Sequence, residues 1–262
     1  MSHRRARVVR FEDGDKASWG RVNATGMVEV LDRAPWEGGA PTGRELPLDG
    51  CTLLAPVTPT KIVCVGRNYA AHAKELGNQV PTEPLIFLKP PSSVIGPGAP
   101  IVLPSISSDV QHEAELALVI GSRCRGVSAA DALSYVHGVT CLNDVTARDI
   151  QRAEIQLARS KSFDTFCPIG PWIVEGAGDL GSLDVRCRVD GELRQDGNTR
   201  DMLHDAARLI AFISRVMTLE PGDAIATGTP AGVATLAAGQ VVEVEIQGIG
   251  TLTNPVVAET GS

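Results

Sequence analysis

The chain has 262 residues, of which 43% are hydrophobic and 21% charged, enough for one large globular domain or a main domain with a small appendage. Its formal net charge of -7 disfavours general binding to nucleic acid or anionic membranes, although a small anionic substrate needs only local positive charge. No apolar run approaches the roughly 20 residues of a membrane-spanning helix. We therefore expect neither nucleic acid nor a membrane as a partner.

The cysteines indicate a reducing environment. All six are scattered along the chain without a Cys-x-x-Cys pair, and four lie in apolar, strand-like segments. Such spacing favours buried free thiols over disulfides or metal ligation. We therefore predict a cytoplasmic protein.

The first elements predict a β-meander over residues 1 to about 55. Strand-like segments at residues 7–12, 18–22 and 27–31 are separated by turn-forming residues such as Asp13-Gly14. Residues 35–47 are rich in Gly and Pro and show no period, which predicts a loop or linker. Because no catalytic constellation lies here, we predict a small N-terminal β domain, residues 1–55, and a catalytic domain, residues 56–262.

A short helix with a candidate general base follows. Residues 61–66 form an apolar, strand-like run, and the Ala-rich segment after it ends at Gly77, which is typical of a helix terminus. His72 and Glu75 are three residues apart and so lie on one helical face. A carboxylate beside an imidazole orients the ring and raises its basicity. The alternative is an ordinary polar pair on a solvent-exposed helix.

Residues 111–120 predict the strand around which the chain is organised. Side chains two apart on a strand share a face, so Glu113 and Glu115 point the same way, ~7 Å apart. The opposite face is apolar and is predicted to be core: Ala114, Leu116, Leu118 and Ile120. Two buried like charges repel unless a cation lies between them. The alternative is a solvent-facing edge strand.

Asp144 adds a third carboxylate. It follows the apolar run of residues 135–142, and Thr146 and Asp149 have the spacing of a helix start. Asp144 alone is equally well explained as a helix-capping residue. Together with Glu113 and Glu115, it offers three acidic oxygen donors without a His or Cys cluster, which suits Mg²⁺ or Mn²⁺ better than zinc. We therefore predict a metal site.

The next segment carries candidate ligand-binding side chains. A helix is predicted from Ala147 to about Ala158, with Arg148 and Gln151 three residues apart near Asp144. Lys161 lies in the aperiodic segment that follows the helix. Lys161 is either a surface residue or a group that binds a substrate carboxylate or stabilises an enolate.

The last third of the chain contains a predicted core helix and one tight loop. Residues 203–219 have the apolar spacing of an amphipathic helix, and we interpret its stripe as core. Residues 228–233 follow a strand, and their small side chains let backbone N–H groups approach an anion. This loop is too short for a nucleotide-binding P-loop.

Five motifs, in this order, resemble the fumarylacetoacetate hydrolase family. They are Val65 to Tyr69 with His72 and Glu75, Glu113-x-Glu115, Asp144 to Gln151, Lys161-Ser162-Phe163, and Gly228-Thr229-Pro230-x-Gly232-Val233. The likeness spans residues 60–255 and is closest to acylpyruvase/oxaloacetate decarboxylase members and to bacterial isomerase/decarboxylases. It implies an α+β, β-rich fold, a mixed β-sandwich roll with a small N-terminal β domain. It also implies a homodimer that holds Mg²⁺ or Mn²⁺.

The same resemblance implies roles for individual residues. Glu113, Glu115 and Asp144 would be the metal ligands, and Val65 stands in the neighbourhood where longer relatives have a fourth acid. The implied catalytic residues are His72 and Glu75, as a general-base dyad on a lid, with Lys161 as electrostatic support. The implied substrate-binding residues are Arg67, Tyr69, Lys89, Arg148, Gln151 and Thr229.

The activity implied is metal-dependent cleavage of a C–C bond in a small anionic 2-oxo or 2,4-dioxo acid, with a pyruvate enolate as leaving group. Acylpyruvate or fumarylpyruvate hydrolysis and oxaloacetate decarboxylation fit this description. The alternative is a 2-hydroxyhepta-2,4-diene-1,7-dioate isomerase / 5-oxopent-3-ene-1,2,5-tricarboxylate decarboxylase of aromatic catabolism. A binding protein with a degenerate site is disfavoured because every polar position is filled. A phosphatase would require a second metal or a phosphate cradle.

Overall fold

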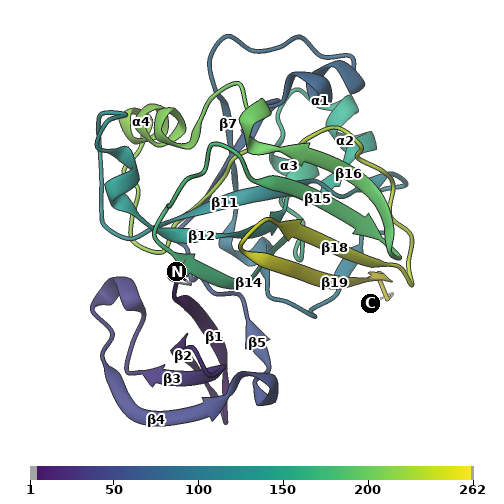
Figure 1. Ribbon diagram of the computed structural model, residues 1–262. Helices are drawn as coiled ribbons and strands as arrows, with labels where there is room; N and C mark the ends of the chain where they lie inside the picture. The colour runs from purple at the N-terminus through teal and green to yellow at the C-terminus, as the bar shows by residue number, and fades with distance from the viewer. Residues whose placement is uncertain (1–4, 261–262) are drawn as a thin grey trace.

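Two large β-sheets dominate the computed structural model, which describes residues 5–260 (Figure 1). The first sheet has 12 strands, ten of them in the order β4-β3-β2-β1-β14-β12-β11-β17-β6-β7, while β5 pairs with β1 and β8 with β14. Its strands are β1 (Arg7–Asp13), β2 (Lys16–Val22), β3 (Met27–Leu31), β4 (Pro41–Pro47), β5 (Leu53–Leu54), β6 (Ile62–Gly66), β7 (Leu85–Lys89), β8 (Val94–Ile95), β11 (Ala114–Ile120), β12 (Val136–Asn143), β14 (Cys167–Glu175) and β17 (Ala224–Ala226).

The second sheet has five strands in the order β16-β15-β18-β19-β9. They are β9 (Ile101–Leu103), β15 (Asp184–Val189), β16 (Glu192–Asn198), β18 (Val241–Ile246) and β19 (Gly250–Ala258), and a separate pair is formed by β10 (Val110–Gln111) and β13 (Thr146–Ala147). Most pairings are antiparallel, whereas β17 runs parallel to β6, β8 to β14 and β9 to β19. The predicted strand-rich, mixed-sheet fold is confirmed.

The main core lies between the two sheets. Strands β15, β18 and β19 pack in front of β11, β12 and β14 (Figure 1). The apolar face predicted for β11 lies in this core, since Ala114, Leu116, Leu118 and Ile120 are all fully buried within it. The other face of β11 is buried too, in a second apolar cluster that includes Ala117 and Val119. A strand buried on both faces is a rigid support for Glu115.

The four α-helices found in residues 5–260 cover the ends of the sheets. They are α1 (Ala70–Glu75), α2 (Arg148–Ala153), α3 (Ala158–Lys161) and α4 (Ala206–Val216). Helices α1, α2 and α3 gather at one end of the sheets, and α4 lies at the other (Figure 1).

The N-terminal meander continues the large sheet. Strand β1 pairs with β14 at Arg7–Val174 and Val8–Ile173, while β2, β3 and β4 extend outward. The predicted loop over residues 35–47 is wrong in its second half, which is strand β4. All of β4 except Leu46 is exposed, so it lacks the apolar alternation that identifies a strand, and pairing with β3 on one side stabilises it instead. The boundary at residue 55 stays a prediction.

Two predicted helices are shorter in the structure. The helix predicted from Ala147 to Ala158 ends at Ala153, because Glu154 adopts an extended backbone, and α3 then begins a new turn. Helix α4 starts at Ala206 rather than Leu203, because the side chain of Asp205 accepts a hydrogen bond from Arg208 N and caps the helix.

The thiols match a further prediction. All six cysteines are free, and five of them are buried. Burial raises the pKa of Cys141, Cys167 and Cys187 to about 12, so these thiols stay protonated. Among residues 5–260, none of the helices has the length and apolar character needed to cross a membrane.

Candidate active site

Three carboxylates converge where β11 and β12 meet. Glu113 directly precedes β11, Glu115 lies within it, and Asp144 follows the last residue of β12. The antiparallel register pairs Ala114 with Asn143, and Asp144 N donates to Glu113 O at 2.9 Å, which brings the three acids together. One oxygen from each carboxylate lies within 4.8 Å of the others. All three side chains are buried.

This donor set fits a hard divalent cation. Buried carboxylates that face one another repel, and an ion between them removes the repulsion. The three acids contribute only oxygen ligands, as Mg²⁺ and Mn²⁺ prefer. The structure therefore brings together the residues of the predicted metal site, and their ligand role stays a prediction.

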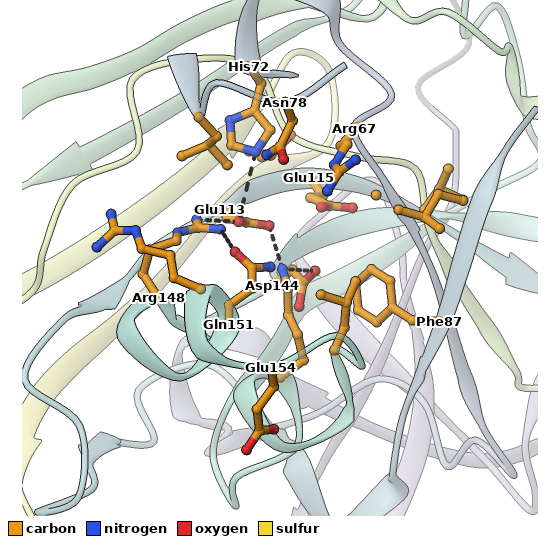
Figure 2. Close-up of a pocket in the computed structure, with 18 of the residues that line it drawn as sticks. Arg67, His72, Asn78, Phe87, Glu113, Glu115, Asp144, Arg148, Gln151 and Glu154 are labelled. Atoms are coloured by element: carbon orange, nitrogen blue, oxygen red, sulfur yellow. Dashed lines mark hydrogen bonds and ion pairs between the residues drawn. The ribbon is translucent and has the colours of Figure 1, made fainter. Parts of the chain in front are cut away.

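Basic side chains already interact with two of the acids. Lys161 Nζ donates to Glu113 Oε2 and to Asp144 Oδ2, each at 2.7 Å, and Lys89 Nζ donates to Asp144 Oδ1 at 2.6 Å. Arg148 donates to Glu113 Oε1 at 2.5 Å (Figure 2). Burial favours the neutral form of Glu113 and would raise its pKa, but the charges of Lys161 and Arg148 hold that pKa below its ordinary value. Likewise the charges of Asp144 and Glu113 raise the pKa of Lys161 despite its burial.

Glu115 is different from the other two acids. Its Oε2 accepts a hydrogen bond from Gly228 N at 2.7 Å, and no ion pair is formed by its side chain with residues 5–260. Burial, and then the charges of Asp144 and Glu113, raise the pKa of Glu115 well above its ordinary value. Of the three acids, Glu115 therefore has the most to gain from a bound cation.

The predicted dyad is present on α1. His72 Nδ1 lies 3.2 Å from Glu75 Oε2. On the other side of the ring, His72 Nε2 lies 4.0 Å from Glu113 Oε1 (Figure 2). Glu75 Oε1 accepts a second hydrogen bond, from Gly232 N at 2.9 Å. The carboxylate therefore fixes one face of the imidazole and leaves Nε2 directed at the acids.

The acids form the floor of a cavity of about 340 Å³. Of the predicted site residues, the following line it: Arg67, His72, Glu113, Glu115, Asp144, Arg148, Gln151, Lys161 and Thr229. Leu76, Leu85, Phe87 and Leu157 add apolar walls. The remaining predicted residues Tyr69, Glu75 and Lys89 lie outside the lining. Tyr69 is 2% exposed, and its hydroxyl has no hydrogen-bond partner among residues 5–260. Lys89 is buried against Asp144.

Sequence reasoning missed Gln195, which braces the site from the second sheet. Its Nε2 donates to Thr229 Oγ1 and to Pro230 O, both at 2.7 Å. Its Oε1 lies 2.9 Å from His112 Nδ1 and accepts from Ala114 N at 3.0 Å. The backbone N–H of Ala114 and the carbonyl of Pro230 fix the orientation of the amide. Only the packing of the second sheet against β11 could have revealed this, because Gln195 lies in an ordinary polar hairpin.

The hydrogen bonds of Gln195 and Thr229 also determine whether the Thr229 hydroxyl can donate to a ligand. Thr229 Oγ1 accepts from Gln195 and donates its only proton to Ala114 O at 2.8 Å. The hydroxyl therefore has no proton left for a substrate anion, and the backbone N–H is the remaining donor of this residue.

A second missed residue, Asn68, ties the loop before α1 to the body of the protein. Its Nδ2 donates to Thr227 O at 2.7 Å and to His204 O at 3.0 Å, and its Oδ1 accepts from His204 N at 2.9 Å. The side chain is 1% exposed. It therefore holds the segment that leads to His72.

Two family models match the sequence. Residues 61–257 match the family model described as fumarylacetoacetate (FAA) hydrolase C-terminal, and residues 6–56 match one described as Rv2993c-like, N-terminal. The oxaloacetate decarboxylase, mitochondrial, of Dictyostelium discoideum is 48% identical over 200 residues, which cover 74% of this chain and 92% of the relative.

Two solved structures are also similar. The 2-hydroxyhepta-2,4-diene-1,7-dioate isomerase of Mycobacterium marinum has a TM-score of 0.90 at 42% identity and covers 98% of this chain and 100% of its own. The maleylpyruvate hydrolase of Sphingobium sp. SYK-6, in complex with manganese (II) ion and pyruvate, has a TM-score of 0.79 at 34% identity and covers 97% of this chain and 100% of its own.

Proposed function

The chain belongs to the fumarylacetoacetate hydrolase family, and from this premise we propose that it is a metal-dependent hydrolase that cleaves a C–C bond of an acylpyruvate or fumarylpyruvate. The observation that carries the proposal is the position of His72. Its Nδ1 faces Glu75, and its Nε2 faces Glu113 at the edge of the acidic cluster. A histidine held in this way can take a proton from a water molecule beside the substrate.

Glu113, Glu115 and Asp144 would hold the cation, which is Mg²⁺ or Mn²⁺ by the chemistry of the donors. When bound, the cation would polarise the 2-oxo group and offset the charge of an enolate. The manganese and pyruvate in the maleylpyruvate hydrolase structure support such an assignment.

The side chains of the protein would move the proton and stabilise the charges that form during the reaction. His72 Nε2 accepts a proton from water, and Glu75 stabilises the imidazolium that results. The water oxygen attacks the distal carbonyl, and the C–C bond to that carbonyl breaks. The bonding electrons pass to the pyruvate fragment as an enolate, which lies in the positive field of Lys161 and Arg148. The imidazolium of His72 returns its proton to C3 of the enolate, which gives pyruvate, and the other fragment leaves as a carboxylic acid that ionises in water.

Oxaloacetate decarboxylation is a second candidate. It needs the same enolate stabilisation but no attacking water, and the Dictyostelium relative at 48% identity is an oxaloacetate decarboxylase. Isomerisation of a dienoate, the reaction that the Mycobacterium marinum structure is named for, needs only proton transfer and remains the alternative. We also expect the protein to be a cytoplasmic homodimer.

His72→Ala separates the two candidates. Removal of a general base typically costs about 10²- to 10⁴-fold in rate. We therefore expect acetylpyruvate hydrolysis to fall by at least roughly 100-fold, while oxaloacetate decarboxylation falls much less. His137→Gln, a change of an imidazole outside the cavity lining, is the matched control. Equal losses of both activities in His72→Ala would contradict the role of His72 in activating water.

A further inference from the structure

One buried histidine beside the acids has no part in the proposed reaction. His112 directly precedes Glu113, is fully buried and lies outside the cavity lining. Its Nδ1 lies 2.9 Å from Gln195 Oε1. Its Nε2 is also buried and has no hydrogen-bond partner among residues 5–260. Within the described part of the chain, the imidazole therefore forms a single hydrogen bond, the one with Gln195.

The surroundings of Gln195 decide which atom of this hydrogen bond carries the proton. Ala114 N can only donate, and it donates to Gln195 Oε1 at 3.0 Å. Pro230 O can only accept, and Gln195 Nε2 donates to it at 2.7 Å. The amide oxygen therefore faces His112, so His112 Nδ1 must carry a hydrogen and donate it. In a neutral ring Nε2 is then a buried acceptor without a donor, which is unfavourable, and the bond to Gln195 is the one polar interaction that the ring gains.

Gln195 passes this constraint to a loop at the cavity wall, residues 228–232. Its Nε2 donates to Thr229 Oγ1 and to Pro230 O, both at 2.7 Å. Both bonds depend on the direction of the amide, because a reversed amide would present its oxygen to the Pro230 carbonyl. The Nδ1–H of His112 opposes this reversal, since the reversed amide would place its own N–H groups against that donor. His112 therefore fixes the amide in the direction that holds the loop.

The same loop contacts both the acidic cluster and the dyad. Gly228 N donates to Glu115 Oε2 at 2.7 Å, and Gly232 N donates to Glu75 Oε1 at 2.9 Å. Thr229 lies between these two contacts in the chain and lines the cavity. A change in the middle of the loop therefore alters where Thr229 meets a ligand, while carboxylates still hold the two ends.

We propose that His112 is a positioning residue, which orients the Gln195 amide and thereby holds Thr229 at the cavity wall in the place where it meets the substrate. This inference rests on the proposed function for the contact between Thr229 and the substrate. His112 itself acts from outside the lining, where it is fully buried, so its effect reaches the substrate only through Gln195.

Three substitutions of His112 separate its donor from its volume. His112→Leu removes the Nδ1–H. His112→Asn keeps a donor in the same place, because Nδ2 of asparagine and Nδ1 of histidine are both bonded to Cγ, whereas His112→Gln moves the donor one bond further out. Loss of one hydrogen bond corresponds to roughly 3- to 10-fold in affinity, so the KM of acetylpyruvate should rise by this factor in His112→Leu and His112→Gln, with little change in kcat. His112→Asn should stay near the wild-type KM.

Equal KM values in the wild type and all three variants would overturn the proposal. If His112→Leu does not fold, the comparison of His112→Asn with His112→Gln decides, and equal KM values in these two variants would overturn it.

A double variant tests whether His112 acts through Gln195. Gln195→Leu removes the amide that His112 orients, so the addition of His112→Leu to Gln195→Leu should raise KM no further. If the two single effects on KM multiply in the double variant, His112 acts independently of Gln195 and the proposal is wrong.

Two controls exclude indirect effects. Because His112 adjoins Glu113, Mn²⁺ affinity is measured by calorimetry in each variant and should equal that of the wild type. A matching loss of Mn²⁺ affinity in His112→Leu would assign the effect to Glu113 and overturn the proposal. His137→Leu changes an imidazole that packs against Trp36 outside the cavity lining, so it should leave KM unchanged.

Binding of pyruvate separates this inference from the proposed function. Pyruvate is the fragment that the proposed substrates share, so with saturating Mn²⁺ its affinity should fall by roughly 3- to 10-fold in His112→Leu and stay near the wild-type value in His112→Asn. If the wild type cleaves no acylpyruvate but pyruvate binding follows this pattern, the hydrolase proposal fails and the positioning role stands. If acetylpyruvate is cleaved but neither KM nor pyruvate affinity follows the pattern, the positioning role fails and the hydrolase proposal stands.

Discussion

Lys161→Met tests the two ion pairs that Lys161 forms with Glu113 and Asp144 at the floor of the cavity. Lys161 is 2% exposed and donates to Glu113 and Asp144 at 2.7 Å each, so methionine removes the charge at similar volume. Loss of one partner of a buried ion pair costs about 3–5 kcal/mol. Because Arg148 still pairs with Glu113 and Lys89 with Asp144, we expect the lower end, ~3 kcal/mol in the free energy of unfolding.

The assay is thermal and urea unfolding in EDTA and then with Mn²⁺. At this chain length each kcal/mol shifts the Tm by about 2–4 °C, so the variant should melt roughly 6–12 °C below the wild type in EDTA. Mn²⁺ should stabilise the variant more than the wild type, because the ion then supplies charge that Lys161 no longer provides. Lys16→Met, at an exposed position of β2, is the matched control. Equal stability of Lys161→Met and wild type in EDTA would contradict the stabilising role of the ion pairs of Lys161 with Glu113 and Asp144.

Three other variants test neighbouring parts of the account. Glu115→Gln should abolish metal-dependent turnover. It should leave the metal-free protein at least as stable as the wild type, because the carboxylate accepts one backbone hydrogen bond and faces two other acids. Full turnover in this variant would show that Glu115 is not a metal ligand. Gln195→Leu should raise the KM of the substrate more than it lowers kcat and leave the Mn²⁺ affinity unchanged, because it removes the hydrogen bonds that hold the Thr229 loop. Lower stability with unchanged KM and kcat would show that Gln195 does not position the substrate-binding loop. Gly138→Ala should destabilise the protein by about 1–3 kcal/mol in urea unfolding, because a Cβ there would lie 2.4 Å from Val174 O; a neutral effect would contradict the close pairing of β12 and β14.

The acidic cluster could be predicted because its signal is local. The alternation of Glu113 and Glu115 with apolar residues, and the position of Asp144 at a strand end, are visible in the sequence. The antiparallel pairing of β11 with β12 then brings these acids within 4.8 Å of one another. The apolar face of β11 was predictable for the same reason, since a period of two is characteristic of a strand.

The remaining features depend on contacts between distant parts of the chain. Gln195 reaches Thr229 from the second sheet, and the sequence around it is that of a polar hairpin. Lys89 pairs with Asp144 although the two are 55 residues apart, which no local pattern indicates. Strand β4 is exposed and has no apolar alternation, so only its pairing with β3 identifies it. Where neighbours along the chain do not determine structure, pattern reasoning has no signal.

Turnover of the EDTA-stripped protein with fumarylpyruvate and acetylpyruvate, before and after addition of Mg²⁺ or Mn²⁺, is the most direct test of the central claim. We expect no cleavage without metal and restored release of pyruvate with it. Cleavage that persists unchanged in EDTA, or no cleavage of either compound with metal present, would contradict the claim that the three acids and His72 form a hydrolase site.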